Sequence, residues 1–383
     1  MSAQSPRWIL TALFSASLGV GLIFGFQPPL IALSLIRNGT SGFLIGVVTA
    51  MSLVAIILLG PAYPALIARW GLKGSMVAGL SLAAAAMLAM PFWTGIPAWM
   101  LLRFVGGCGL GLAWIASEVW MNTLSTAGTR GAVMGIYGTI FSLGTAAGPA
   151  LLQFTGTVGW QPFCGGVALL GLTLAPLLFL RDGSARAAVD RPVRGMARLF
   201  AAAPVVMLAA AVAGLVESAE LSLLPVYGLR AGLDEHAALF MVAVFLVGNV
   251  VLQLPIGLLA DRFGRRRLLG ICAALSTLGP LLLPSMISQP ELLWVLLFVW
   301  GGTLYAFYSQ GVALLAEVFG AASLAAANTV FVMVYCLGGV IGPSLGGIAM
   351  DRWPGTGLPA LLSAAPLLLL LTLLARRTTT VSA

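Results

Sequence analysis

The sequence predicts an all-α integral membrane protein whose twelve transmembrane helices form two pseudo-symmetric bundles of six. Three features predict this fold class: an apolar composition, a series of long apolar segments and an internal repeat. Of the 383 residues, 60% are hydrophobic and 8% are charged, and the mean hydropathy is +1.06. Soluble domains have about 25% charged residues, so the composition excludes that class.

Twelve apolar segments are long enough to cross a bilayer, whose hydrocarbon core takes roughly 20 helical residues. The predicted spans cover residues 8–36, 42–67, 73–93, 97–124, 131–155, 161–180, 202–228, 236–260, 267–288, 292–318, 323–348 and 357–375. Connections as short as residues 94–97 join antiparallel neighbours. The first segment is longer than the apolar region of a signal peptide, so we expect it to remain as a span.

The basic residues predict the orientation. Fifteen Lys and Arg residues lie in connections or termini on one side, whereas only Arg37, Arg230 and Arg352 lie on the other. Because cytoplasmic loops are enriched in Lys and Arg, we expect both termini to be cytoplasmic in a multi-pass protein of the cytoplasmic (inner) membrane. The formal charge of +8 therefore reflects topology, and no nucleic-acid partner is expected.

The two halves of the chain repeat. Residues 104–105 recur as 298–299 and residues 144–149 as 338–343, both at a shift of 194, and residues 69–71 recur as 262–264 at a shift of 193. The repeat predicts an N-terminal bundle over residues 1–180 and a C-terminal bundle over 201–383. Residues 181–200 hold five arginines without apolar periodicity and are predicted to be a cytoplasmic linker.

Residues 257–268, Gly-Leu-Leu-Ala-Asp-Arg-Phe-Gly-Arg-Arg-Arg-Leu, lie between two apolar spans. An apolar helix ends there, the chain turns at Gly264, and arginines hold the turn in water. The motif resembles the signature loop of the major facilitator superfamily, which implies two bundles that expose a midplane site alternately to each side. The implied conformational lock comprises Asp261, Arg262, Gly264, Arg265, Arg266 and Glu317. The first half has Ala68 at the motif aspartate, so its lock is expected to be weaker or built differently.

The fourth span contains two charges, each of which needs a partner or a purpose inside a membrane. At about 100° per residue, one face holds Arg103, Gly107, Gly111, Trp114, Glu118 and Asn122. Residues 101–109 resemble the superfamily's fourth-helix motif, whose arginine, here Arg103, the family associates with proton coupling, although Gly106 replaces its usual glutamine. Residues 118–122, including Glu118, Trp120 and Asn122, resemble the E-x-W-x-N segment of the YcaD-like branch. The alternative is that Glu118 anchors Arg69 or Lys73.

Glycines in the fifth and eleventh spans are predicted to allow close helix packing. The fifth-span pattern, Gly135, Gly144, Gly148 and Pro149, resembles the antiporter motif of the drug/proton antiporters, with Leu151-Leu152 where that family often has two glycines. Gly338, Gly342 and Pro343 repeat the pattern in the eleventh span. The alternative is small-residue packing with no bearing on the direction of transport.

Glu217 and Glu220 lie three residues apart near the middle of the seventh span. Burial disfavours a carboxylate charge unless Arg103 or another cation is close, so either acid is expected to exchange a proton near neutral pH. The alternative is that the pair only satisfies nearby backbone or hydroxyl groups. A shift of 193 places Gln27 opposite Glu220. Further candidates for a substrate cavity are polar or aromatic residues within spans: Gln27, Trp114, Trp120, Asn122, Tyr137, Asn249, Gln253, Tyr305, Tyr308 and Gln310.

Enzyme chemistry is not expected. Cys108, Cys164, Cys272 and Cys336 lie within predicted spans without a C-x-x-C pair, and the single His236 follows two acids at a helix start, where a metal ligand is the alternative. The only lysine, Lys73, belongs to no phosphate-binding loop. We therefore expect no cofactor and no metal.

The resemblance implies a secondary active transporter in the lipid bilayer, and we expect it to be a monomer. Our first expectation is proton-coupled efflux of a small organic molecule by antiport, with Glu217, Glu220, Glu118 and Arg103 as the coupling residues. The alternatives are proton-coupled symport for uptake and a non-transporting receptor or scaffold on the same fold.

Overall fold

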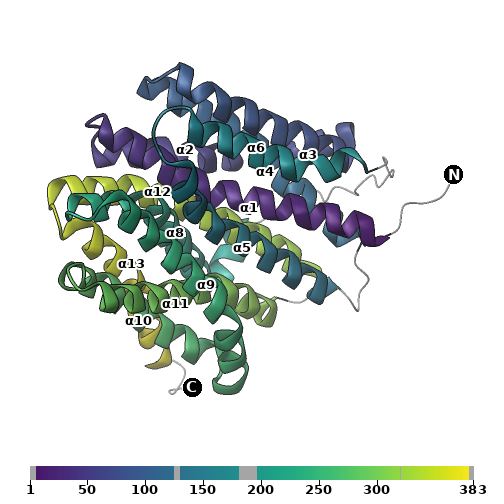
Figure 1. The fold of residues 1–383 in the computed structure, drawn as a ribbon. Helices are drawn as coiled ribbons and strands as arrows, with labels where there is room; N and C mark the ends of the chain where they lie inside the picture. The colour runs from purple at the N-terminus through teal and green to yellow at the C-terminus, as the bar shows by residue number, and fades with distance from the viewer. Residues whose placement is uncertain (1–5, 125–129, 181–195, 320, 379–383) are drawn as a thin grey trace. The chain divides into compact units, whose positions relative to one another are not determined.

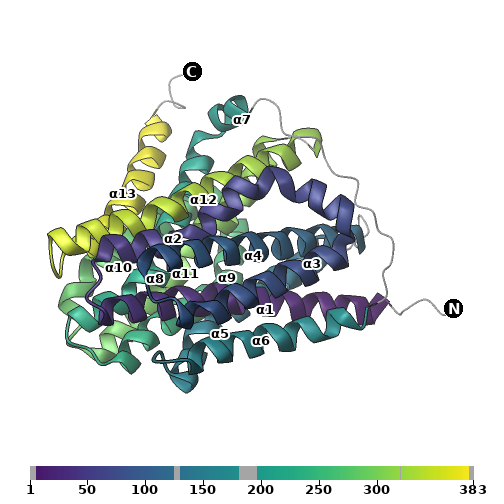
Figure 2. The same cartoon turned by 90° about the horizontal axis from the view of Figure 1, so that it is seen from above.

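The computed structural model describes residues 6–124, 130–180, 196–319 and 321–378, which are helical apart from short turns (Figures 1 and 2). The helices are α1 (Pro6–Arg37), α2 (Gly42–Leu59), α3 (Tyr63–Ala89), α4 (Ile96–Leu124), α5 (Arg130–Thr155), α6 (Gln161–Leu178), α7 (Met196–Ala202), α8 (Pro204–Arg230), α9 (Glu235–Phe263), α10 (Arg265–Met286), α11 (Pro290–Val318), α12 (Ala321–Arg352) and α13 (Gly357–Thr378). Single-turn 3-10 helices, Gly60–Ala62 and Met90–Phe92, flank α3.

The described helices supply the expected membrane spans. Eleven segments are long and apolar enough to cross a membrane, and one of them, Gly42–Phe92, has 51 residues. A straight helix of that length would reach about 77 Å, more than twice the hydrocarbon thickness. The helix breaks at Gly71, whose φ of 73° and ψ of 169° are not helical, so this segment makes two spans and the described residues supply twelve in total.

Gly264 is the counterpart of Gly71 in the second half. It has a φ of 89° and separates α9 from α10. Only glycine adopts such a left-handed conformation at little cost, which explains why both turns carry it. The prediction of a turn at Gly264 is confirmed, and the two equivalent turns support the repeat at a shift of 193.

The chain forms two compact units. The first unit comprises Met1–Leu30 and Met51–Pro192, and the second comprises Ile31–Ala50 and Val193–Ala383. Residues 31–50, the end of α1 and the beginning of α2, therefore pack with the second unit, although the repeat assigns them to the first bundle. The bundle boundaries at 180 and 201 remain a prediction.

The predicted linker is not loop throughout. Residues 181–195 lie outside the described part, but Met196–Ala202 form helix α7. This segment is rich in Ala, Leu, Met and Arg, which are strong helix formers. Ala203 leaves the helical region because Pro204 follows it, and α8 then begins.

Glycines bring equivalent helices together in each unit. In the first unit, a Cβ on Gly144 or Gly148 of α5 would collide with backbone atoms of α1, and Gly21 of α1 faces the Phe141 carbonyl in the same way. In the second unit, Gly338 and Gly342 of α12 meet the backbone of α8, and Gly214 of α8 meets the Tyr335 carbonyl. The expected close approach is confirmed at these glycines. Gly135 does not share it, because no described neighbour outside its own helix lies within 4 Å of its Cβ position.

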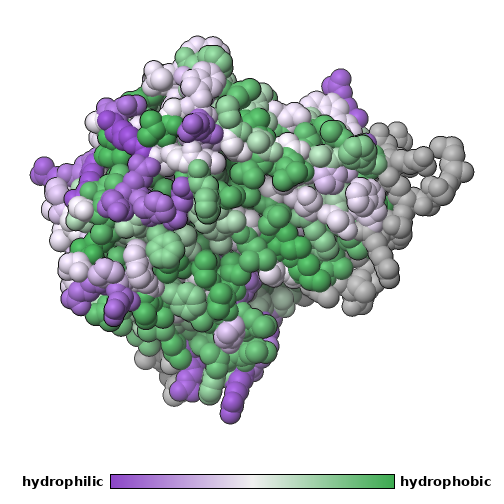
Figure 3. All heavy atoms as spheres, in the orientation of Figure 1, coloured by the Kyte–Doolittle hydropathy of each residue, from purple (hydrophilic) through white to green (hydrophobic). Residues whose placement is uncertain are grey.

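Large apolar side chains cover much of the helix surfaces, including Phe154, Leu172 and Leu254, which are 86%, 71% and 71% exposed. Figure 3 shows hydrophobic residues over much of the face drawn, with hydrophilic ones gathered toward its margins. Surfaces of this kind suit contact with lipid rather than water.

Candidate functional site

Arg103 is buried within the first unit, where only 5% of it is exposed. Its guanidinium donates a hydrogen bond to Oε1 of Gln27 on α1. Ser52 of α2 donates to the Arg103 backbone carbonyl at 3.0 Å. The sequence predicted both Arg103 and Gln27 as site residues, and the structure brings them together.

The polar face of α4 is interrupted by packing. Gly107 and Gly111, predicted to share the face with Arg103, lie against the Ser52 backbone and the Tyr63 hydroxyl. The predicted face is therefore not one continuous cavity wall, because two of its turns are filled by neighbouring helices. Glu118 lies 15 residues beyond Arg103, or about 22 Å along the helix.

Glu118 is held by its own helix. Trp114 donates an indole hydrogen bond to Oε1 of Glu118 at 3.0 Å, and Asn122 donates to the Glu118 backbone carbonyl at 3.0 Å. The alternative that Glu118 anchors Arg69 or Lys73 is wrong for the described residues, which give Glu118 no ion pair. Lys73 instead donates to the backbone carbonyls of Leu178 and Leu180 at the end of α6.

Aromatic residues surround Trp114. The Phe24 and Phe141 rings lie 5.6 Å and 5.9 Å from the Trp114 ring, centroid to centroid, and 5.8 Å from each other. Tyr137 is buried, and its hydroxyl lies 2.7 Å from Ser117 Oγ. Trp120 is also buried, with 5% exposed, so it does not line an open surface in this structure.

Glu217 lies beside tyrosines in the second unit. The Tyr335 hydroxyl of α12 donates to Oε2 of Glu217 at 2.8 Å. The Tyr308 ring of α11 lies 5.2 Å from the Tyr335 ring and 6.4 Å from the Tyr305 ring. Glu217 of α8 is therefore bound by α12, and α11 packs against the tyrosine that binds it.

The internal repeat relates this cluster to the aromatic group of the first unit. Shifts of 193 and 194 place Glu217, Tyr308 and Tyr335 at the positions of Phe24, Trp114 and Phe141. The three rings of the first unit all contact one another, whereas in the second unit Tyr335 contacts both Glu217 and Tyr308. The second unit has an acid and two phenols where the first has only aromatic packing.

Glu220 has no exposed surface, and neither of its carboxyl oxygens has a hydrogen-bond partner among the described residues. At the equivalent position in the first unit, Gln27 accepts from Arg103. The repeat places Leu297 where Arg103 would be, so the second unit lacks that cation. The expectation that Glu220 could satisfy nearby polar groups is not met in the described part.

The other predicted cavity residues of the second unit are mostly buried. Gln253 of α9 donates to the Tyr305 hydroxyl at 3.0 Å. Asn249 and Gln310 are 6% and 5% exposed, and each has a buried side-chain oxygen without a described hydrogen-bond partner. They lie on α9 and α11, the two helices joined by the Gln253–Tyr305 bond.

The predicted lock residues also meet. Arg265 pairs with Asp261 at 2.9 Å and with Glu317 at 3.2 Å, so one arginine joins the end of α9, the start of α10 and the end of α11. Arg266 is exposed, and Arg262 lies over the Phe263 ring at 5.5 Å. Arg265 rather than Arg266 is therefore the partner of Glu317.

Comparison with known proteins decides the family. The sequence model of the Major Facilitator Superfamily matches residues 9–244 and 206–382. The chain belongs to the Major Facilitator Superfamily. It is 24% identical to the uncharacterized MFS-type transporter YfkF of Bacillus subtilis, over 92% of this chain and 90% of the relative. It is 26% identical to the uncharacterized MFS-type transporter YcaD of Shigella flexneri, over 94% of each.

Solved structures agree with the superfamily fold. The nucleoside transporter NupG superposes with a TM-score of 0.76 at 15% identity, covering 96% of this chain and 98% of that one. A D-xylose-proton symporter gives a TM-score of 0.76 at 18% identity, covering 96% and 97%. The predicted superfamily and its fold are confirmed, and the chain is a multi-pass secondary transporter rather than an enzyme.

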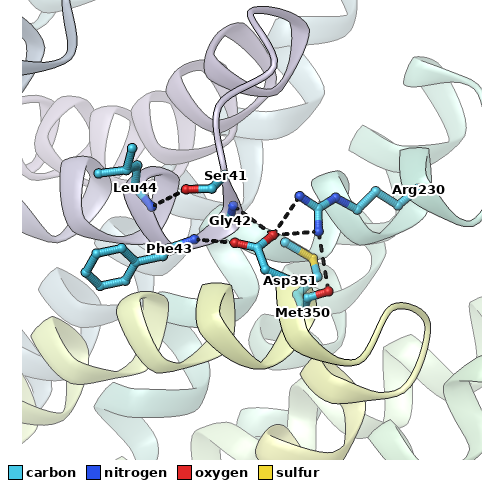
Figure 4. Close-up of polar contacts among 7 residues, drawn as sticks. All are labelled: Ser41, Gly42, Phe43, Leu44, Arg230, Met350 and Asp351. Carbon is cyan, nitrogen blue, oxygen red and sulfur yellow. Dashed lines mark hydrogen bonds and ion pairs between the residues drawn. The ribbon is translucent and has the colours of Figure 1, made fainter.

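Two side chains with important contacts, those of Tyr335 and Asp351, are not predicted by the sequence analysis. Tyr335 was not chosen as a site residue, although it is a lone phenol three residues before Gly338 of the predicted packing motif. Asp351 was also missed. It binds two backbone N–H groups of α2 and Arg230 of α8 (Figure 4). The sequence feature that could have indicated Asp351 is a single acidic residue at the end of an apolar span.

Proposed function

We propose that this secondary transporter is proton-coupled and that Glu217 and Glu220 carry the exchanged proton. The observation behind the proposal is the pair of acids on α8 without an ion pair among the described residues. A buried carboxylate with no cation is costly, so proton binding lowers its cost and proton release raises it. The protonation state of the pair can therefore bias the two conformations of the cycle.

Tyr335 supports a role for Glu217 in particular. Its hydroxyl donates a 2.8 Å hydrogen bond to the Glu217 carboxylate, and the Tyr308 ring packs against the Tyr335 ring. The first unit has Phe24 at the equivalent position, so the fold does not require a charged residue there. The acid is therefore a specific feature of the second unit and not a structural requirement of the repeat. Arg103 and Glu118 are proposed as accessory coupling residues of the first unit.

Export by antiport is our first choice for direction. The glycine and proline pattern of α5, which resembles the drug/proton antiporter motif, supports it. The similar fold of a D-xylose-proton symporter keeps uptake by symport as the second candidate. We further propose that the protein acts as a monomer in the inner membrane, with both termini cytoplasmic.

The test starts with purified protein and a thermal-shift screen of small organic molecules at several pH values. A stabilising compound is then loaded into proteoliposomes and its flux is measured with and without a pH gradient. Gradient-dependent flux supports proton coupling, whereas equal flux under both conditions contradicts it. The sign of the gradient that accelerates export distinguishes antiport from symport.

A further inference from the structure

Residues 31–50 form a segment, here called the outer hairpin, that comprises the end of α1 and the beginning of α2. It belongs to the second compact unit, whereas the remainder of both helices belongs to the first. The boundary in α1 follows Pro28 and Pro29, which donate no backbone hydrogen bonds to the helix. The hairpin thus has a weakened connection to its own helix and a separate attachment elsewhere.

Asp351, near the end of α12, makes that attachment. Its Oδ1 accepts from the Gly42 N–H and its Oδ2 from the Phe43 N–H, both at 3.0 Å (Figure 4). Two nitrogens of the Arg230 guanidinium donate to Oδ1 at 2.9 Å. The first N–H groups of a helix have no acceptor within it, and a carboxylate there is favoured by the helix dipole.

Neighbouring contacts close the same interface. Arg37, at the end of α1, pairs with Glu235, at the start of α9. A Cβ on Gly46 would collide with the Pro343 carbonyl, and a Cβ on Gly347 with the Gly42 carbonyl, so α2 and α12 touch through their backbones. The outer hairpin is therefore held by one ion pair, by two backbone hydrogen bonds to Asp351 and by glycine packing.

The hairpin attachment and the Arg265 cluster lie at opposite ends of the second unit. Helix α9 has 29 residues, with Glu235 at its first position and Asp261 near its last. Its length is about 43 Å, more than the hydrocarbon core of a bilayer. By the positive-inside expectation, Asp351 is on the outer side and Asp261 on the cytoplasmic side.

We propose that Asp351 is a positioning residue of the transport cycle, which fastens the outer hairpin to the second unit while the outer face is closed and releases it when that face opens. The inference rests on alternating access and on the predicted orientation, but not on proton coupling. Asp351 suits this role because one carboxylate joins three helices, α2, α8 and α12. Removing it frees the hairpin without disturbing Glu217 or Glu220.

Hydrogen exchange of the full-length protein in detergent, without substrate, tests the proposal. In Asp351→Asn, amides of residues 38–50 are expected to exchange about tenfold faster, because bonds to the charged group are lost. Amides of residues 261–268 are expected to exchange more slowly, since opening one face closes the other. Arg352→Gln, an exposed neighbour, is the matched control and should change neither segment. Faster exchange confined to residues 38–50 would show that Asp351 stabilises the hairpin only locally, and it would overturn the proposal.

A charge exchange separates the backbone contacts from the ion pair. In the double variant Arg230→Asp with Asp351→Arg, opposite charges remain, but an arginine at 351 cannot accept from the Gly42 and Phe43 N–H groups. The hairpin is therefore expected to exchange as fast as in Asp351→Asn. Wild-type exchange in the double variant would show that the α2 contacts are dispensable and would contradict the role given to Asp351.

A cross-link covers the case in which the double variant does not fold. Phe43 and Ile348 line the same shallow pocket beside Asp351. The cross-link is made by Phe43→Cys with Ile348→Cys, in a protein that lacks the native cysteines and carries Asp351→Asn. Oxidation should restore slow exchange of residues 38–50 and normal exchange of residues 261–268. If oxidation changes the exchange of residues 38–50 alone, the two ends of the second unit are not linked and the proposal is wrong. None of these measurements uses a proton gradient, so their failure is distinct from failure of proton coupling.

Discussion

The Tyr335 hydroxyl donates a 2.8 Å hydrogen bond to Glu217, at the positions where the first unit packs Phe141 against Phe24 with ring centroids 5.8 Å apart. The contact between α1 and α5 is thus apolar, whereas the equivalent contact between α8 and α12 contains an ionisable carboxyl group. This difference locates the proposed proton site in the second unit.

Tyr335→Phe tests the contribution of this hydrogen bond. The donor favours the charged carboxylate, so its loss favours the protonated form. We expect the pH of half-maximal gradient-driven flux to move upward by about 1 unit. Tyr63→Phe is the control, because its hydroxyl donates to the Cys108 carbonyl in the first unit. An unchanged pH profile in Tyr335→Phe would remove the tyrosine from the coupling site.

Glu220→Leu is expected to stabilise the protein. Leucine removes two buried oxygens that have no described hydrogen-bond partner, so the free energy of unfolding should rise by about 1–3 kcal/mol. Gln27→Leu, at the equivalent position, should lower it instead, since Arg103 loses an acceptor. Thermal unfolding in detergent measures both. A destabilised Glu220→Leu protein would mean that this carboxyl has a structural partner.

Gly148→Ala is expected to weaken the packing of α5 on α1. The added methyl group meets the Phe26 and Gly25 backbone, which cannot move aside as a side chain can, so the cost should be about 1–3 kcal/mol. Gly135→Ala is the matched control on the same helix, with no described neighbour within 4 Å, and should be neutral or slightly stabilising. Equal melting temperatures for the two variants would refute the close-packing role.

Asp261→Asn tests the lock at the Arg265 cluster. The side chains of Asp261 and Glu317 are 66% and 58% exposed, and such ion pairs contribute about 0–1 kcal/mol, so folding should be nearly unchanged. We expect slower flux with ligand binding retained. Glu291→Gln, an exposed acid at the other end of α11, should leave flux at the wild-type rate. Full activity in Asp261→Asn would show that the lock is dispensable.

Much of the fold could be predicted because the membrane restricts it. Apolar length gave the spans, positive-φ turns at Gly71 and Gly264 follow from glycine in a repeated motif, and small residues at Gly144 and Gly338 mark the close helix contacts. These features are local or periodic in the sequence. They follow from hydrogen bonding and sterics within one or two helices.

The remainder depends on contacts between distant helices. Periodicity placed Gly107 and Arg103 on one face of α4 but could not show that α2 fills part of it. The pairing of Glu217 with Tyr335 joins residues 118 positions apart. The attachment of residues 31–50 to the second unit contradicts chain order, because Asp351 provides acceptors that the start of α2 lacks.

Proton movement in proteoliposomes tests proton coupling most directly. A pH-sensitive dye inside the vesicles reports the proton flux that accompanies addition of a ligand found by thermal shift. The wild-type protein should move protons with the ligand, while at least one of Glu217→Gln and Glu220→Gln should still bind and move it without proton flux. Unchanged proton coupling in both variants would contradict the account and transfer the proposed proton site to Glu118.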